Sequence, residues 1–338
     1  MSFKVHRFDE PGAQPIHHKF LIVGDSGAGK TIAACRAEAD LDLDLDEVWA
    51  GSAKPVGDPE MFYLGFERNS LTAARLINPR IGFQLAELVP EEPEAGLEGV
   101  PDPAHALKIA TEVIRAAASG ELARMGFKRI VVDGITELQR LMKDDIVDGL
   151  IGDAANEEWR ENWFSQDDWN FLKEKTRRAA NWIRAISSID VVVTALEDTF
   201  ESRRAGATQA SDKVGPKMEG RDGAALLQYF EAAGRMERIV VPLAAGRERV
   251  EHRVMFTGPS RYKIKPCGPI TGWQKPCAAA WGAVLEGRLP PDRTRIRDSM
   301  TVADPESDRR PSVDPKAGEV GGEPTKKATR SARKSSAA

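Results

Sequence analysis

The stretch Lys19–Thr31, KFLIVGDSGAGKT, decides the fold of this chain. An apolar run over residues 20–23 ends in Gly24, and glycine recurs at Gly27 and Gly29. Glycine adopts backbone conformations that other residues avoid, so successive amide groups can turn inward there. The stretch therefore predicts a buried strand, a turn whose amides can surround an anion, and a helix that begins at its end.

Residues 24–31 match the complete pattern G-x-x-x-x-G-K-[ST] of the P-loop. In such a loop the ammonium group of Lys30 contacts the β- and γ-phosphates, and the hydroxyl of Thr31 binds Mg²⁺. A plain glycine-rich turn is the alternative, but the Lys-Thr pair after a strand favours a nucleotide site. We predict ATP and Mg²⁺ as cofactors, with the nucleotide bound by Gly24, Asp25, Ser26, Gly27, Ala28, Gly29, Lys30 and Thr31.

Two later apolar strands end in carboxylates. Residues 61–66 predict a strand followed by Glu67, and residues 127–132 predict a strand that ends in Asp133. The carboxyl ends of parallel strands face the ligand crevice of an α/β protein. An apolar strand that ends in Asp is the Walker B form, so we predict that Asp133 holds Mg²⁺ opposite Thr31.

The composition indicates a globular chain with one core and a tail. Its 338 residues are 41% hydrophobic and 30% charged, and the net charge of −4 excludes a basic field over the whole molecule. Three cysteines form no C-x-x-C pair and no apolar leader precedes them, which favours a cytoplasmic protein. No apolar run approaches the length of about 18 residues that indicates a membrane span.

We predict three regions along the chain. Residues 1–16 are a loose lead-in, residues 17–288 form the core, and residues 289–338 form a disordered tail that ends in a basic run. Within the core, residues 40–60 carry seven acids and predict a solvated loop, with an edge strand or a partner-binding segment as alternatives.

The patterns also predict the order of the remaining elements. Helices are expected at 104–118, 135–150, 166–187 and 224–230. Strands are expected at 83–89 and 189–194, and an antiparallel extension at 232–241, 250–256 and 262–265.

The segment 198–223 predicts a long loop, which inside a compact domain is usually functional or disordered. A solvated loop is the alternative, because the segment also carries acids. Just before it, Thr194 and Glu197 are candidates for sensing the γ-phosphate. Candidates for binding DNA are its basic residues, Arg203, Arg204, Lys213, Lys217 and Arg221.

These motifs together resemble the RecA-core ATPases, and most closely the phage-encoded short RecA-like proteins that act as single-strand annealing recombinases. The resemblance covers roughly residues 17–270. It is carried by GDSGAGKT at 24–31, the strand before Glu67, IVVDGITEL at 130–138, Asp168-Trp169, VVVTALE at 191–197, and Tyr262-Lys263-Ile264-Lys265.

The resemblance implies an α/β fold with a RecA-like P-loop NTPase core, whose mainly parallel sheet is flanked by helices. It also implies a DNA-dependent ATPase that forms a ring or filament, binds single-stranded DNA, works beside a single-strand binding protein and resides in the host cytoplasm. Glu67 would polarise the attacking water, and Lys265 would reach the γ-phosphate of a neighbouring subunit. Leu196 stands where the family tends to place a polar residue, and Cys267 stands where it usually has Arg.

Two other functions remain open on the sequence. One is a nucleotide-gated scaffold with slow turnover, and the other is a different P-loop enzyme, such as a packaging motor or a small-molecule kinase. The Walker B strand lies far along the chain after an inserted helix, and this order favours the RecA type.

Overall fold

The structure is a computed structural model, which describes residues 16–89, 99, 101–153, 164–202, 211–218, 226–242 and 248–296. All of these residues belong to one compact unit that ends at Arg297. None of the helices within these ranges is long and apolar enough to cross a membrane.

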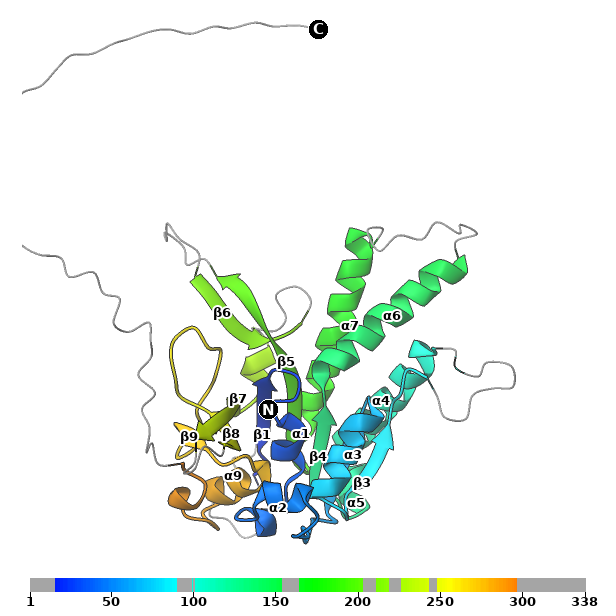
Figure 1. Cartoon of the computed structure of the whole chain (residues 1–338). Coiled ribbons are helices and arrows are strands. Elements are labelled where there is room, and N and C mark those ends of the chain that lie inside the picture. Colours follow the sequence, from blue (N-terminus) through cyan, green and yellow to red (C-terminus); the bar gives the residue numbers. More distant parts are fainter. Residues whose placement is uncertain are drawn as a thin grey trace, which may run out of the picture. The chain divides into compact units, whose positions relative to one another are not determined.

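The described strands form one nine-stranded sheet (Figure 1). They are β1 (Lys19–Gly24), β2 (Met61–Gly65), β3 (Gly82–Leu85), β4 (Arg129–Asp133), β5 (Asp190–Ser202), β6 (Ser211–Pro216), β7 (Ala232–Pro242), β8 (Glu248–Met255) and β9 (Trp273–Gln274). Their order is β3-β2-β4-β5-β1-β7-β8-β9, and β6 pairs with β5. Strands β1 to β5 run parallel, and β7 runs parallel to β1. Since β8 and β9 add in antiparallel orientation, the predicted α/β fold with an antiparallel extension is confirmed.

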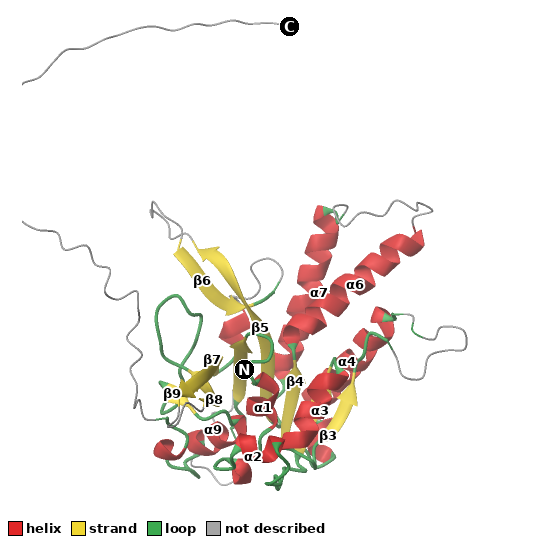
Figure 2. Ribbon diagram, in the orientation of Figure 1, coloured by secondary structure: helices red, strands yellow, loops and turns green. Residues whose placement is uncertain are grey.

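Helices cover both faces of the sheet (Figure 2). They are α1 (Lys30–Cys35), α2 (Leu45–Trp49), α3 (Arg68–Ile77), α4 (Pro103–Ala118), α5 (Glu121–Arg124), α6 (Ile135–Asp153), α7 (Gln166–Ala185) and α9 (Ala278–Leu285). Short 3-10 helices span η1 (Glu38–Asp40), η3 (Leu227–Tyr229) and η5 (Pro291–Arg293).

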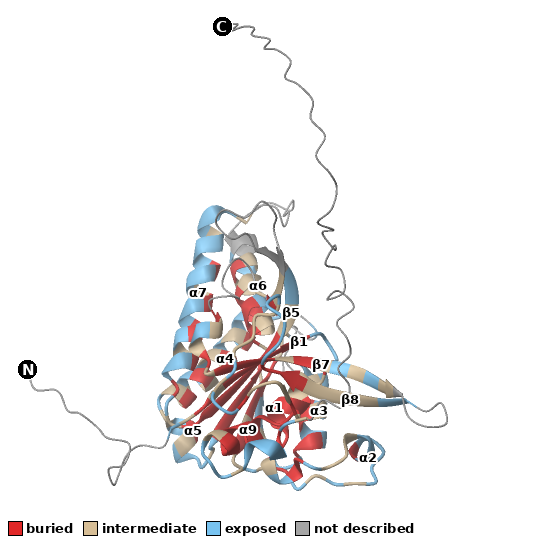
Figure 3. Cartoon of the chain, turned by 90° about the vertical axis from the view of Figure 1, so that its left-hand side faces the viewer, coloured by how far each residue is buried: buried red, intermediate tan, exposed pale blue. Residues whose placement is uncertain are grey.

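The central strands are apolar at consecutive positions because both of their faces are buried. In β1, Phe20 and Ile22 pack against α1, α3 and α9, whereas Leu21 and Val23 pack against α4, α6 and α7. Successive side chains of a strand point to opposite faces, so each strand supplies both halves of the core. Figure 3 shows this buried sheet at the centre of the molecule. A sheet packed on both sides fixes the positions of the strand ends, where the functional residues lie.

The acidic segment 40–60 is neither a plain loop nor an edge strand. It begins at the last residue of η1 and contains α2, and Asp40 at its start is only 4% exposed. The carboxylate of Asp40 accepts hydrogen bonds from the amides of Val56 and Gly57, each at 2.9 Å, and so closes the segment on itself. Asp44 caps the first turn of α2. Asp40 and Asp44 therefore act as local hydrogen-bond acceptors, which a count of charges does not reveal.

The prediction of a long loop at 198–223 is wrong for its described residues. Strand β5 continues to Ser202, and β6 returns antiparallel to it, with Phe200 opposite Lys213. The predicted strand at 262–265 is replaced by isolated bridges, because Tyr262 pairs with Val214 and Lys265 with Ala233. The predicted strand at 83–89 is the shorter β3.

The described structure continues beyond the predicted end of the core at residue 288. Helix η5 follows, and the amide of Ile296 donates to the carbonyl of Trp273 at 3.0 Å. The rest of the predicted tail, residues 297–338, lies outside the described residues, as does most of the predicted lead-in, residues 1–15.

Candidate functional site

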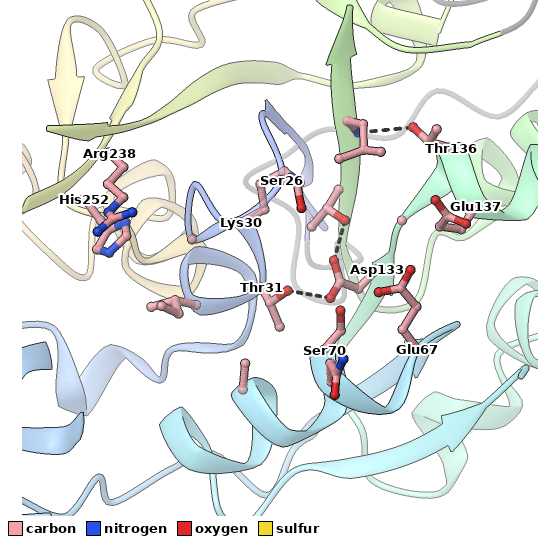
Figure 4. A pocket seen from close by; sticks show the side chains of 18 of the residues that line it. Ser26, Lys30, Thr31, Glu67, Ser70, Asp133, Thr136, Glu137, Arg238 and His252 are labelled. Atoms are coloured by element: carbon pink, nitrogen blue, oxygen red, sulfur yellow. Dashed lines mark hydrogen bonds between the residues drawn. The ribbon is translucent and has the colours of Figure 1, made fainter. Parts of the chain in front are cut away.

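A cavity of about 730 Å³ lies beyond the carboxyl ends of β1, β2 and β4 (Figure 4). Ligands of open α/β sheets bind at this edge. The cavity brings together most of the residues that the sequence predicts, although they are far apart in the chain. They are Ser26, Gly27, Gly29, Lys30, Thr31, Glu67, Asp133 and Thr194.

The turn between β1 and α1 has the backbone that the glycine pattern predicts. Gly29 has a φ of 97° and Gly27 a φ of 74°, both in the left-handed region that favours glycine. A Cβ atom at Gly29 would lie 2.7 Å from Nδ1 of His252, so a larger residue does not fit. The same Nδ1 donates a hydrogen bond to the carbonyl of Ala28 at 2.8 Å, so His252 on β8 supports the turn.

The side chain of Lys30 folds back onto the start of the P-loop. Its Nζ donates to the carbonyls of Gly24 at 2.9 Å and Asp25 at 2.7 Å. Burial lowers the pKa of the Lys30 ammonium, and the charges of Asp133 and Asp25 oppose this effect. The negative phosphates of a nucleotide would favour the charged ammonium in the same way.

The carboxylate of Asp133 accepts hydrogen bonds from three hydroxyl groups. Thr31 donates to it at 2.7 Å, Tyr63 at 2.9 Å and Thr194 at 2.5 Å. Asp133 is 8% exposed, and hydrogen bonds to an ionised group of this kind are strong. Burial raises the pKa of Tyr63, so its phenol stays a donor. The arrangement holds Asp133 in one orientation beside Thr31.

Gly65 makes the contact between Tyr63 and Asp133 possible. Tyr63 is opposite Val131 and Gly65 is opposite Asp133 in the parallel pairing of β2 with β4. A Cβ atom at Gly65 would lie 2.4 Å from the ring of Tyr63. The missing side chain therefore leaves the space through which the phenol reaches the carboxylate.

Thr31 and Asp133 form a donor set that suits Mg²⁺. This cation takes oxygen ligands, keeps several waters and is bound through one or two carboxylates together with substrate phosphates. A hydroxyl and a carboxylate 2.7 Å apart, next to a P-loop, provide such a partial shell. The ion would neutralise the charge that develops on the phosphates during phosphoryl transfer.

Two carboxylates, Glu67 and Glu137, lie at one end of the cavity (Figure 4). Glu67 is the N-cap residue of α3, but its side chain makes no cap hydrogen bond, and its neighbour Arg68 pairs with Glu87. Glu67 forms no ion pair with another described residue, so its carboxylate remains available to a water molecule. Burial raises the pKa of Glu137, an effect that Arg140 at 3.2 Å opposes and that the charge of Glu67 increases.

The remaining sensor and catalytic candidates do not all reach the cavity. Glu197 is not among its lining residues, because both of its carboxylate oxygens bind Arg235, at 2.7 and 2.9 Å. Lys265 does not line it either, and its Nζ donates to the carbonyl of Phe230 at 2.5 Å. Leu196, where a polar residue was expected, does line it. Asp25 and Ala28 border a smaller hollow of about 360 Å³ instead.

The candidates for binding DNA are only partly described. Arg203, Arg204 and Arg221 lie outside the described residues. Lys213 donates to the carbonyl of Ser260 at 2.9 Å. Lys217 is exposed and borders a hollow of about 770 Å³ next to the candidate site.

Sequence reasoning missed several residues that line or support the cavity, among them Tyr63, Trp49, Arg238 and His252. Tyr63 was missed because it lies in the apolar run of a predicted buried strand. Trp49 was missed because it lies in the acidic segment. Arg238 and His252 lie on neighbouring strands, opposite each other in the register of β7 and β8. The only sign of Arg238 and His252 in the sequence was that both are polar residues within predicted strands.

Comparison with known proteins identifies the family. A family model described as an AAA domain matches residues 16–262, which include every lining residue of the cavity. No curated protein matches the chain. Because the match covers well over half of the chain, this protein belongs to the AAA domain family, and its core is an AAA-type P-loop ATPase domain.

Proposed function

We propose that this protein hydrolyses ATP with Mg²⁺, is stimulated by single-stranded DNA, and acts as a homo-oligomer in DNA recombination or strand annealing. One observation carries the hydrolytic part. The hydroxyl of Thr31 and the carboxylate of Asp133 are paired beside the P-loop, while Glu67 borders the same cavity without a described partner. A pair of groups that can hold a metal ion, together with a carboxylate that can act as a base beside the same P-loop, would support phosphoryl transfer to water.

The stimulation by DNA is supported by hydrogen bonds that join the cavity to Lys217, the residue that directly follows β6. The hydroxyl of Thr136, which lines the cavity, accepts from the amide of Leu196 at 3.1 Å and donates to the carbonyl of Lys217 at 3.0 Å. Lys217, Arg140 and Lys143 border the neighbouring hollow, together with acidic side chains. A DNA strand bound in this hollow would contact residues that are hydrogen-bonded to Thr136 of the nucleotide site.

The recombination role and the oligomer rest on the motifs that resemble the short RecA-like annealing proteins. In that arrangement the nucleotide lies between subunits. The late lysine of the motif, Lys265, contacts its own chain here through the carbonyl of Phe230, so a trans contact requires that it change partner in the assembly.

The test is ATP turnover, measured as phosphate release with and without single-stranded DNA on a preparation of known oligomeric state. Lys30→Ala should abolish turnover and leave the circular dichroism spectrum unchanged, because the ammonium group of Lys30 donates to the P-loop carbonyls of Gly24 and Asp25 and is expected to contact phosphate. Lys217→Ala should reduce the stimulation by DNA. The matched control is Lys128→Ala, since Lys128 is exposed, pairs with Glu60 and does not line the cavity.

Undiminished turnover in Lys30→Ala would refute the nucleotide site. Turnover that does not respond to DNA would refute the DNA-dependent part. Turnover that is slow and does not respond to DNA would instead favour a nucleotide-gated scaffold.

A further inference from the structure

The cavity has two chemically different ends. In Figure 4, Lys30 lies between the carboxylates of Glu67 and Glu137 on one side and the side chains of Arg238 and His252 on the other. The phosphates belong at Lys30, and the carboxylates mark the end where water attacks the γ-phosphate. The nucleoside must therefore extend toward the end formed by β7 and β8.

That second end is completed by α2, the short helix of the acidic segment. Asp46 and Trp49 of α2 line the cavity together with Ile32, Val250 and His252. Arg249 of β8 pairs with Asp44, the cap of α2, at 3.3 Å. This ion pair places α2 beside β8, on the side of the cavity away from Glu67.

Trp49 is the large aromatic residue at this end. It is 48% exposed, although its neighbour Val48 on the same helix is 3% exposed and anchors the helix in the core. Trp49 therefore leaves apolar surface open on the wall of a concave site. Covering that surface with a flat apolar ligand would be favourable.

Several contacts hold the segment before α2 in a fixed position. The guanidinium of Arg36, which is 4% exposed, donates to the carbonyls of Asp40 and Leu43. Lys275 pairs with Asp42 at 2.8 Å. A segment that is fastened to the core in this way presents Trp49 without the entropic cost of ordering it on binding.

We propose that the base of the bound nucleotide stacks on the indole of Trp49, so that the acidic segment 40–60 forms the nucleoside half of the site. The proposal rests on the proposed function, because it takes the ligand to be a nucleoside triphosphate. Stacking on an aromatic ring recognises the flat face that every base has. Ile32 and Val250 add apolar surface to the lining of the same cavity.

The experiment compares the affinities of two probes, ATP and inorganic tripolyphosphate, each with Mg²⁺, by calorimetry on the full chain. Trp49→Ala should weaken the binding of ATP by about 10-fold, within the range for one base on one aromatic ring, and leave the affinity for tripolyphosphate unchanged. Trp49→Phe should keep most of the affinity for ATP. The matched control is Trp169→Ala, because Trp169 is 37% exposed on α7, packs on Phe164 and does not line the cavity.

Fluorescence provides a second measurement that does not depend on the alanine variant. ATP should quench part of the tryptophan emission of the wild type, and this quenching should be lost in Trp49→Phe. Tripolyphosphate should not quench the emission of either protein. Unchanged ATP affinity in Trp49→Ala, or an equal loss for both probes, would refute stacking. A wild type that binds ATP but does not hydrolyse it would refute the proposed function alone, and the same two probes would still test Trp49.

Discussion

Substitution of Glu67 by Gln is the sharpest test of how this site would activate water. The side chain is exposed, makes no cap hydrogen bond to α3 and has no ion-pair partner among the described residues. Its neutralisation should therefore change the free energy of unfolding by no more than about 0.5 kcal/mol. Glutamine has the same shape, so the cavity keeps its form and only the negative charge is lost.

The expected loss of turnover follows from the role of a positioned general base. Such a group contributes a factor of about 10²–10⁴, which corresponds to roughly 2.7–5.4 kcal/mol of transition-state stabilisation. Binding of ATP with Mg²⁺ should persist in Glu67→Gln, because Lys30, Thr31 and Asp133 are untouched. The assay is single-turnover phosphate release, with the affinity for ATP measured separately on the same variant.

Glu137→Gln is the matched control, because Glu137 is the other carboxylate at this end of the cavity. Its carboxylate is already paired with Arg140 at 3.2 Å, so its replacement should lower turnover less than that of Glu67. A fall of less than a few-fold in Glu67→Gln, or a larger fall in Glu137→Gln, would show that the assignment of the base is wrong. Loss of ATP binding together with turnover would show that Glu67 is structural.

Two further predictions concern buried hydrogen bonds. Tyr63→Phe removes one of the hydroxyls that Asp133 accepts, and it should lower the free energy of unfolding by about 1.5–3 kcal/mol in urea denaturation; a loss below about 0.5 kcal/mol would contradict this role. The hydrogen bond from His18 to Glu231, at 2.8 Å, raises the pKa of His18. The stabilisation of the folded state by the charged imidazole is therefore complete below about pH 6.5 and is lost as the pH rises through the raised pKa. The difference in unfolding free energy between the wild type and His18→Gln should therefore shrink with rising pH, and a constant difference would contradict the assignment.

The local parts of the site were determined by the sequence alone. The turn at residues 24–31 depends on glycines within one short segment, and their left-handed backbones at Gly27 and Gly29 are present in the structure. The apolar strand that ends in Asp133 was recognisable for the same reason, since a strand buried on both faces is a continuous apolar run. Because parallel strands end at one edge of a sheet, Asp133 could be placed near Thr31 before any contact was known.

Only the tertiary structure decided which other side chains surround these residues. Tyr63 reaches Asp133 because β2 pairs with β4 in one register and Gly65 leaves space for the ring. His252 supports the P-loop because β8 pairs with β7, and Trp49 lines the cavity because α2 is held beside β8. The pattern of a sequence reports preferences over a few residues, whereas strand register and helix docking result from packing between segments far apart in the chain.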